Sequence, residues 1–400
     1  MKARQFIEDL DLKGRRVLIR VDFNVPLDEN QKITDNARIA AALPSIRRII
    51  ESGGKCILMS HLGRPKGQRV ESMSLKPAAE ELSLLLEKNV SLAPDCIGSE
   101  VEKMVSQMEE GELLLLENLR FHQGETKKDP QFCEALARLG EVYINDAFGT
   151  AHRAHASTAG VAAMMEDRAV GYLIRKELEF LGAAVLDPQK PFTAILGGAK
   201  VSDKIKVIER LMEKVDALII GGGMANTFLK AQGMEIGDSL LEEDALETAK
   251  NLLDEAKKSG VKIHLPVDVC TAQELLQEVE TKFLKVEDKV QAGWKILDIG
   301  PESVKQFGSV IQNSKTVLWN GPMGVFEYPA FASGTKGVTE ALAKATDAGA
   351  VSIIGGGDSA AAVNQFGMQD RITHISTGGG ASLEFLEGKE LPGVSVIPEK

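Results

Sequence analysis

Arginine side chains concentrate in the first half of this chain, inside short polar segments. Of the 16 arginines, 13 precede residue 170. Four stand in tight polar clusters, namely Arg38 in Thr34-Asp35-Asn36-Ala37-Arg38, Arg64 in His61-Leu62-Gly63-Arg64-Pro65, Arg120 in Glu117-Asn118-Leu119-Arg120-Phe121 and Arg153 in His152-Arg153-Ala154-His155. A guanidinium group binds phosphate or carboxylate through two parallel hydrogen bonds. The clusters therefore predict a site for a small anionic ligand.

The second half carries glycine runs that each follow an apolar, strand-like stretch. The four runs are Gly197-Gly198, Gly221-Gly222-Gly223, Gly355-Gly356-Gly357 and Gly378-Gly379-Gly380. A buried strand that ends in glycine leaves peptide N–H groups free and lets a ligand approach the backbone, as phosphate sites require. Four such strand ends in one sheet indicate a nucleotide site.

Neither common phosphate fingerprint is present, because the chain lacks Gly-x-x-x-x-Gly-Lys-Ser/Thr and does not complete Gly-x-Gly-x-x-Gly. In their place, Lys200 and Lys204 follow Gly197-Gly198 at the start of an expected helix, where both ammonium groups could face a phosphate. Asp358 and Ser359 follow another glycine run and suit phosphate oxygens and Mg²⁺, and we take Asp358 as the metal ligand. Solvated lysines and a simple helix N-cap at Asp358 are the structural alternatives.

Polar side chains at two further strand ends could also contact ligands. Asp22 and Asn24 follow Val17–Val21 and lie on the same side by the two-residue period, although turn-forming hydrogen bonds explain them equally well. Trp319–Glu327 joins an apolar strand end, a rigid turn and the Glu327 carboxylate, which could accept hydrogen bonds from ribose hydroxyls. A structural turn with a surface glutamate is the alternative. The neighbouring arginines favour His61, His152 and His155 as donors to an anion, whereas His122, His264 and His374 are taken as structural.

Strand-like and helical segments alternate along the whole chain. Expected strands and helices follow one another up to Val142–Ile144, a long amphipathic helix spans 172–186 with Lys176, Glu177 and Glu179 on its polar side, and the alternation then restarts at Thr193. We therefore expect an α/β fold of two doubly wound parallel-sheet, Rossmann-like domains joined by a hinge helix. The boundaries are residues 1–170 and 171–385, with Cys270–Trp294 as a surface insertion.

Composition excludes several classes of protein. The net charge of −11 and the absence of a lysine-rich tract disfavour nucleic-acid binding. Four scattered cysteines support neither a disulfide framework nor a zinc site. The acidic residues Glu8 and Asp9 disfavour a signal peptide, and no apolar stretch reaches the length of a membrane span. We expect a soluble cytoplasmic protein.

Eight collinear motifs together resemble the phosphoglycerate kinase family over nearly the whole chain. They are Arg20–Pro26, His61–Pro65, Glu117–Phe121, Asp146–His155, Gly197–Lys204, Trp319–Glu327, Gly355–Asp358 and Thr377–Ser382. The resemblance implies reversible phosphoryl transfer between 1,3-bisphosphoglycerate and MgADP, which gives 3-phosphoglycerate and MgATP in glycolysis and gluconeogenesis. It also implies a monomer whose C-terminal tail, 386–400, packs on the first domain.

The resemblance assigns roles to individual residues. Those implied to bind phosphoglycerate are Asp22, Asn24, Arg38, His61, Arg64, Arg120 and Arg153. Those implied to bind the nucleotide are Gly198, Ala199, Lys204, Gly222, Gly223, Asn320, Pro322, Glu327, Gly356, Gly357, Asp358 and Ser359, with Mg²⁺ at Asp358. Those implied to surround the migrating phosphoryl group are Arg38, Lys200, Lys204, Gly378 and Gly379. Ser359 stands where many relatives have threonine, and Lys295–Asp298 departs from a stretch often containing glycine near the adenine.

The chemistry of this reaction fits the residue types. A carboxylate nucleophile is already ionised at neutral pH, so no general base is required, and the chain offers cations and backbone dipoles without an evident base dyad. Ligands held by different domains must be brought together by hinge closure. A nicotinamide-dependent oxidoreductase and a non-catalytic nucleotide-binding protein are the rival classes; the missing dinucleotide fingerprint opposes the first, and the intact charged groups oppose the second.

Overall fold

The computed structural model describes residues 4–400, and the chain divides into two compact units. The first unit contains the chain up to Glu179 together with Glu390–Lys400, and the second contains Phe180–Lys389. The first boundary lies inside helix α7 (Tyr172–Leu186). It thus falls nine residues after the expected end of the first domain at 170, and the chain returns to the first unit at Glu390, where 386 was expected.

A six-stranded parallel sheet forms the centre of the first unit. Its strands are β1 (Arg16–Arg20), β2 (Lys55–Met59), β3 (Val90–Leu92), β4 (Leu113–Leu115), β5 (Val142–Asn145) and β6 (Asp167–Val170), in the order β3-β4-β2-β1-β5-β6. The strands are apolar runs because helices cover both faces of such a sheet. The strand order reverses at β1, so right-handed crossovers place helices on opposite faces.

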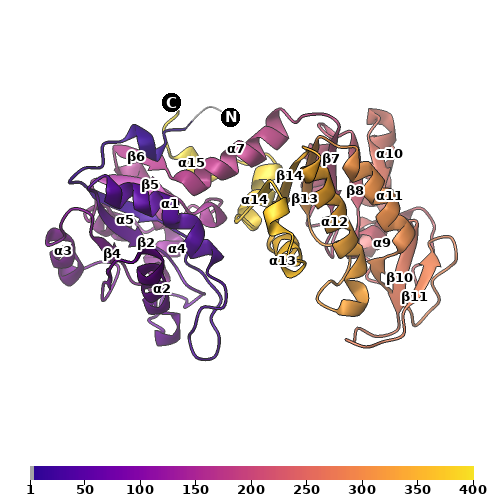
Figure 1. Ribbon diagram of the computed structural model, residues 1–400, viewed down its shortest axis with the longest axis horizontal. Coiled ribbons are helices and arrows are strands. Elements are labelled where there is room, and N and C mark those ends of the chain that lie inside the picture. The colour runs from indigo at the N-terminus through magenta and orange to yellow at the C-terminus, as the bar shows by residue number, and fades with distance from the viewer. Residues whose placement is uncertain (1–3) are drawn as a thin grey trace. The chain divides into compact units, whose positions relative to one another are not determined.

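Helices of the first unit connect these strands (Figure 1). They are α1 (Ala37–Glu51), α2 (Lys76–Leu86), α3 (Ser99–Ser106), α4 (Gln123–Lys127), α5 (Pro130–Ala137), α6 (Val161–Met164) and the first part of α7. In α1, the buried residues Ile39, Ala42, Ile46 and Ile49 recur at helical spacing and pack on the sheet. The doubly wound organisation expected from the sequence is confirmed.

The C-terminal segment belongs to the first unit, and α15 (Pro392–Ser395) lies near β5 and β6 (Figure 1). Asn145 Nδ2 donates a hydrogen bond to Gly393 O at 2.7 Å, and Arg168 Nε donates to Val396 O at 2.8 Å. A side chain on Gly393 would lie 2.9 Å from Asn145 Nδ2, so the tail fits closely at this glycine. The C-terminal tail is therefore held against strands β5 and β6 of the first sheet.

A second six-stranded parallel sheet forms the centre of the second unit. Its strands are β7 (Phe192–Leu196), β8 (Ala217–Ile220), β9 (Lys262–His264), β13 (Thr316–Asn320), β14 (Val351–Gly355) and β15 (His374–Ile375), in the order β15-β14-β13-β7-β8-β9. The helices are α8 (Ile205–Met212), α9 (Gly222–Ala231), α10 (Leu246–Ser259), α11 (Pro301–Gln312), α12 (Ser333–Asp347), α13 (Gly357–Gln365) and α14 (Gly380–Leu386).

The segment expected as a surface insertion is partly a strand of the core. Strands β10 (Asp268–Ala272), β11 (Lys282–Lys285) and β12 (Lys295–Ile299) form an antiparallel sheet with β10 in the middle. All five residues of β10 are buried, whereas β11 is mostly exposed. The expectation of a surface insertion is therefore wrong for its first residues, because β10 pairs with a strand more than 20 residues away.

Two local predictions also require correction. Helix α8 begins at Ile205, with Lys204 as its N-cap, so Lys200 and Lys204 do not share a helix face. Glu177 is 1% exposed and does not belong to a polar side of α7. Among the helices formed by residues 4–400, none combines the length and apolar character needed to cross a bilayer.

Candidate active site

Loops at the carboxyl ends of the first sheet gather the arginines of the first unit. Arg64, Arg120 and Arg153 line a pocket of about 520 Å³ together with Lys66 and His155. These residues follow β2, β4 and β5, whose carboxyl ends meet at one edge of the sheet. Burial lowers the pKa of Arg120 to about 10, which still leaves it charged at neutral pH. The pocket is thus suited to an anion.

Gly63 connects this pocket with the residues after β1. Its N–H donates to Asn24 Oδ1 at 2.8 Å, and its carbonyl accepts from Arg120 Nη1 at 2.7 Å. The backbone of Gly63 is left-handed, with φ of 62°, so a residue without Cβ suits this turn. Arg38 Nη1 in turn donates to Asn24 O at 2.9 Å and to Asp22 Oδ2 at 3.4 Å. Gly63 is therefore linked, directly or through Asn24 and Arg38, to four of the seven expected phosphoglycerate residues, namely Asn24, Arg120, Arg38 and Asp22.

His61 is buried beside Arg20 and is neutral. Burial, with the guanidinium groups of Arg20 and Arg120, holds the pKa of His61 well below its ordinary value. Arg20 Nη2 lies 3.0 Å from His61 Nδ1, and because a guanidinium only donates, Nδ1 must accept. The ring proton is then on Nε2, which makes that atom the donor.

Arg20 is itself held by a buried network that sequence reasoning did not include. Arg20 Nε donates to Ser157 Oγ at 2.9 Å, and Ser157 Oγ donates to Glu125 Oε1 at 2.7 Å. Glu125 is fully buried, and its Oε2 accepts from Ser157 N at 3.0 Å. The sequence signal for this network is Arg20 itself, a charged residue at the end of the buried strand β1. A buried charge requires hydrogen-bonding or charged partners.

The pocket of the second unit has a different character. It measures about 370 Å³ and is lined by the expected residues Gly198, Ala199, Gly222, Gly223, Pro322, Glu327 and Asp358. Apolar residues complete the lining. Leu229 and Leu240 were not expected there, whereas Met323 and Val325 belong to the expected segment Trp319–Glu327. First-turn residues of α9 and α13 belong to the lining. Helix N-termini present N–H groups and partial positive charge to anions, so phosphates fit here beside an apolar wall.

Backbone hydrogen bonds among three glycine loops shape this pocket. Gly198 N donates to Pro322 O at 3.1 Å, Gly222 N to Met323 O at 3.0 Å and Met224 N to Gly198 O at 2.9 Å. A Cβ on Gly222 would lie 2.6 Å from Gly198 N, and φ at this residue is 67°. The loops can approach this closely only with glycine at position 222.

Lys204 and Asn320 form a buried polar pair close to the same loops. Lys204 Nζ donates to Asn320 O at 3.0 Å and also to Asn320 Oδ1. Burial lowers the pKa of Lys204 to about 8, while the carboxylates of Asp358 and Asp203 oppose this shift. Within the part of the chain that the structure describes, the buried Asn320 Nδ2 has no acceptor. This amide donor is thus available to a ligand oxygen.

Other expected nucleotide and transfer residues occupy varied positions. Ser359 is fully buried, and its Oγ accepts from Gly321 N at 2.6 Å, so it supports the loop after β13. The N–H of Gly378 donates to Ser376 Oγ at 3.0 Å and is not open as expected. Gly356 and Gly379 have positive φ of 90° and 50°, and Gly357 and Lys200 are exposed.

Asp298 ends the stretch Lys295–Asp298 and belongs to β12. It lines the pocket but is 2% exposed, and it accepts hydrogen bonds from Gly334 N at 2.7 Å and Ile299 N at 2.9 Å. Burial raises the pKa of Asp298 to about 7. Its carboxyl group therefore holds the first turn of α12 beside the pocket.

Comparisons with known proteins identify the family. The model of the family "Phosphoglycerate kinase" matches residues 7–389. The phosphoglycerate kinases of Chloroherpeton thalassium and Chlorobaculum tepidum are 56% and 55% identical over 394 residues, which are 98% of this chain and 99% of each relative. The phosphoglycerate kinase structure from Coxiella burnetii is 42% identical, covers 98% of both chains and has a TM-score of 0.89. With one anion pocket and one glycine-lined pocket at the carboxyl ends of two parallel sheets, this chain belongs to the phosphoglycerate kinase family.

Proposed function

We propose that this protein catalyses reversible phosphoryl transfer between 1,3-bisphosphoglycerate and MgADP, giving 3-phosphoglycerate and MgATP. The arginine-lined pocket of the first unit is the observation that carries the proposal, since it suits a substrate with both a phosphate and a carboxylate. The enzyme would work as a monomer in the cytoplasm, within glycolysis and gluconeogenesis.

The phosphoglycerate would be held by the cations and hydrogen-bonding groups of the first unit. Arg64, Arg120 and Arg153 supply donors around the pocket. Asp22 and Asn24 suit a substrate hydroxyl, and neutral His61 donates from Nε2. Arg38 is about half exposed, and its bonds to Asp22 and Asn24 aim it from α1 toward the same loops.

The nucleotide would bind in the pocket of the second unit. The apolar wall suits a base, exposed Glu327 suits the ribose hydroxyls, and the first turns of α9 and α13 suit the phosphates. The phosphates, or the loops that contact them, would be held by Lys204, Asn320, Gly356, Gly357 and Ser359. Asp358 fits Mg²⁺, because it presents an exposed carboxylate on the pocket lining, and the ion would neutralise phosphate charge when bound.

Transfer would then depend on position and charge. The attacking carboxylate needs no base, so the protein's task is to align the two substrates and stabilise the charge on the moving phosphoryl group. Arg38, Lys200 and Lys204 would supply cations, and Gly379 and Gly378 would supply N–H groups once Gly378 releases Ser376. Because the two pockets belong to different units, closure of the units around α7 would precede the chemistry and exclude water.

Calorimetric titration of 3-phosphoglycerate into Arg64→Ala tests the substrate site. Removal of one charge-assisted donor should weaken binding by about tenfold or more and leave nucleotide binding intact. Arg69→Ala is the matched control, because Arg69 is also exposed but donates to Pro94 O at 2.7 Å outside the pocket lining. An unchanged affinity in Arg64→Ala would remove Arg64 from the site.

A further inference from the structure

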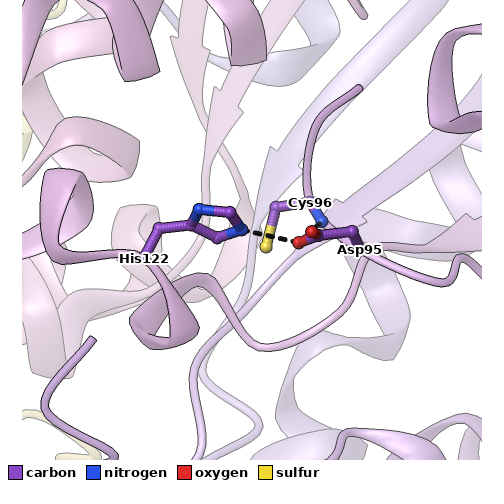
Figure 2. A group of neighbouring side chains, drawn as sticks. All are labelled: Asp95, Cys96 and His122. Carbon is purple, nitrogen blue, oxygen red and sulfur yellow. Dashed lines mark hydrogen bonds and ion pairs between the residues drawn. The ribbon is translucent and has the colours of Figure 1, made fainter. Parts of the chain in front are cut away.

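Three potential metal ligands meet in the first unit, at the side of the arginine-lined pocket, whose lining includes one of them, His122. Asp95 and Cys96 follow β3, and His122 precedes α4 after the neighbouring strand β4. Their donor atoms all lie within 4.8 Å of one another. Figure 2 shows the thiol and the imidazole edge turned toward the same carboxylate. The scattered cysteines gave no indication of a zinc site, because Cys96 and His122 are 26 residues apart in the sequence. The pairing of β3 with β4 brings the segments that carry them together.

His122 and Cys96 are each already oriented by a contact outside the cluster, and both residues also contact the Asp95 carboxylate. His122 Nε2 lies 2.6 Å from Asp95 Oδ1, and the His122 ring stacks on Phe132 with centroids 5.1 Å apart. Cys96 N donates to Asp95 Oδ1 at 2.6 Å, and Cys96 Sγ donates to Glu117 O at 3.0 Å. Outer contacts of this kind fix ligand orientation before an ion arrives.

Burial gives the cluster a closed side and an open side. Cys96 is fully buried, whereas the side chains of His122 and Asp95 are 29% and 43% exposed. An ion could therefore reach the thiol from solvent between the other two ligands. Glu117 lies next to the cluster as a buried carboxylate, and the cation Arg69 is engaged by Pro94 O and the Phe121 ring.

We propose that Asp95, Cys96 and His122 form a binding site for a thiophilic divalent cation of the Zn²⁺ or Co²⁺ class. One thiolate, one imidazole and one carboxylate are the donors that such ions take in tetrahedral sites, with water in the fourth position. Mg²⁺ is excluded by the sulfur and nitrogen ligands. The site is separate from Asp358, which lies in the other unit.

Binding requires small rearrangements that balance in protons. The thiol loses its proton to solvent. The neutral His122 ring exchanges its proton with solvent from Nε2, where it is donated to Asp95, to Nδ1, and Nε2 then binds the ion. Tetrahedral bonds of the usual lengths place ligand atoms roughly 3.5 Å apart, so the widest separation must close by about 1 Å. The partly exposed His122 and Asp95 side chains can make this movement.

Titration of the chelator-treated protein with Co²⁺, followed by absorption spectroscopy, tests the site without reference to activity. We expect one equivalent of Co²⁺ to produce a near-ultraviolet thiolate-to-metal band with visible bands of a tetrahedral ion, and Zn²⁺ to displace it. Cys96→Ala should abolish the thiolate band. His122→Gln should weaken binding at least tenfold, since even the loss of an outer partner can cost that much.

Cys270→Ala is the matched control, because Cys270 is also a buried free thiol but lies in the second unit. It should retain the full Co²⁺ spectrum. Absence of a thiolate band in the unaltered protein, or its persistence in Cys96→Ala, would overturn the proposal. If Cys96→Ala fails to fold, unchanged Co²⁺ affinity in His122→Gln would overturn it instead, because this residue is partly exposed and tolerates replacement.

Discussion

The proton on His61 is positioned by a buried chain of hydrogen bonds through Arg20 and Ser157 to Glu125. Glu125 fixes Ser157, Ser157 accepts from Arg20, and Arg20 donates to His61 Nδ1. A buried chain of this kind fixes both the tautomer and the angle of the ring. His61 itself could be assigned from its position beside Arg64 in the sequence. Glu125 and Ser157 could not, because their partners are far away in the chain.

We therefore expect Ser157→Ala to raise the KM for 3-phosphoglycerate roughly tenfold, with a smaller change in kcat. The change removes the acceptor of Arg20 and a donor to Glu125, and lost hydrogen bonds to charged groups cost about 1.5–3 kcal/mol. Steady-state kinetics measure both constants. Ser106→Ala is the control, since Ser106 is exposed and bonds only within its own helix. A KM equal to that of the unaltered enzyme would show that the network does not position His61.

Arg38→Ala should reduce kcat by about 100-fold or more, because it removes a donor from the charge that develops during transfer. The affinity for MgADP, measured by titration, should change little, since the nucleotide pocket lies in the other unit. Arg47→Ala is the control for a general effect of removing an arginine from α1. Arg47 is exposed and donates to Leu85 O at 2.9 Å. Near-normal turnover in Arg38→Ala would remove this residue from the transfer step.

At the scale of elements, the start of α7 is capped by a buried carboxyl group. Leu173 N and Ile174 N donate to Asp146 Oδ1 at 2.9 and 3.3 Å, and Tyr172 N donates to Ser45 Oγ at 2.8 Å. Burial raises the pKa of Asp146 from 3.8 to about 7, although these hydrogen bonds oppose the shift. The cap of the proposed hinge helix is therefore sensitive to pH.

The raised pKa of Asp146 predicts a loss of stability as pH rises. Between pH 4 and 7 the folded state holds a proton that the unfolded chain has released, so unfolding becomes easier by roughly 2–4 kcal/mol across this window. Asp146→Asn should make this part of the profile less steep, since the amide stays neutral and keeps an acceptor oxygen, while Asp298 still contributes. Denaturant unfolding at several pH values measures the difference. Parallel profiles for the two proteins would contradict the assignment.

Local patterns predicted most elements, and long-range contacts explain the failures. The bounds expected for α7 match the structure, because its apolar spacing is regular. Lys200 was misplaced on a helix because Glu242, 40 residues away, accepts from Ser202 N and Val201 N and holds this segment as a turn. Similarly, β10 is buried in the middle of a sheet, between β11 and the more distant strand β12. Glu242 and β12 are too far away in the sequence for a local pattern to predict these contacts.

For the whole molecule, each unit carries its own ligand pocket. A ligand stabilises the structure to which it binds by mass action. We expect 3-phosphoglycerate to slow amide hydrogen exchange chiefly in the loops after β1, β2 and β4, and MgADP to slow it chiefly after β7, β8 and β13. Hydrogen exchange measured with each ligand alone tests this division. Protection of the first unit alone by MgADP would reverse the proposed assignment.

A coupled assay of ATP consumption with 3-phosphoglycerate and Mg²⁺ tests the proposed reaction most directly. It should be run on the unaltered protein, on Lys200→Ala and on Lys206→Ala, which changes a matched exposed lysine in the first turn of α8. We predict activity that requires 3-phosphoglycerate, collapses in Lys200→Ala and persists in Lys206→Ala. A folded protein that binds the nucleotide but shows no activity dependent on 3-phosphoglycerate would contradict the account.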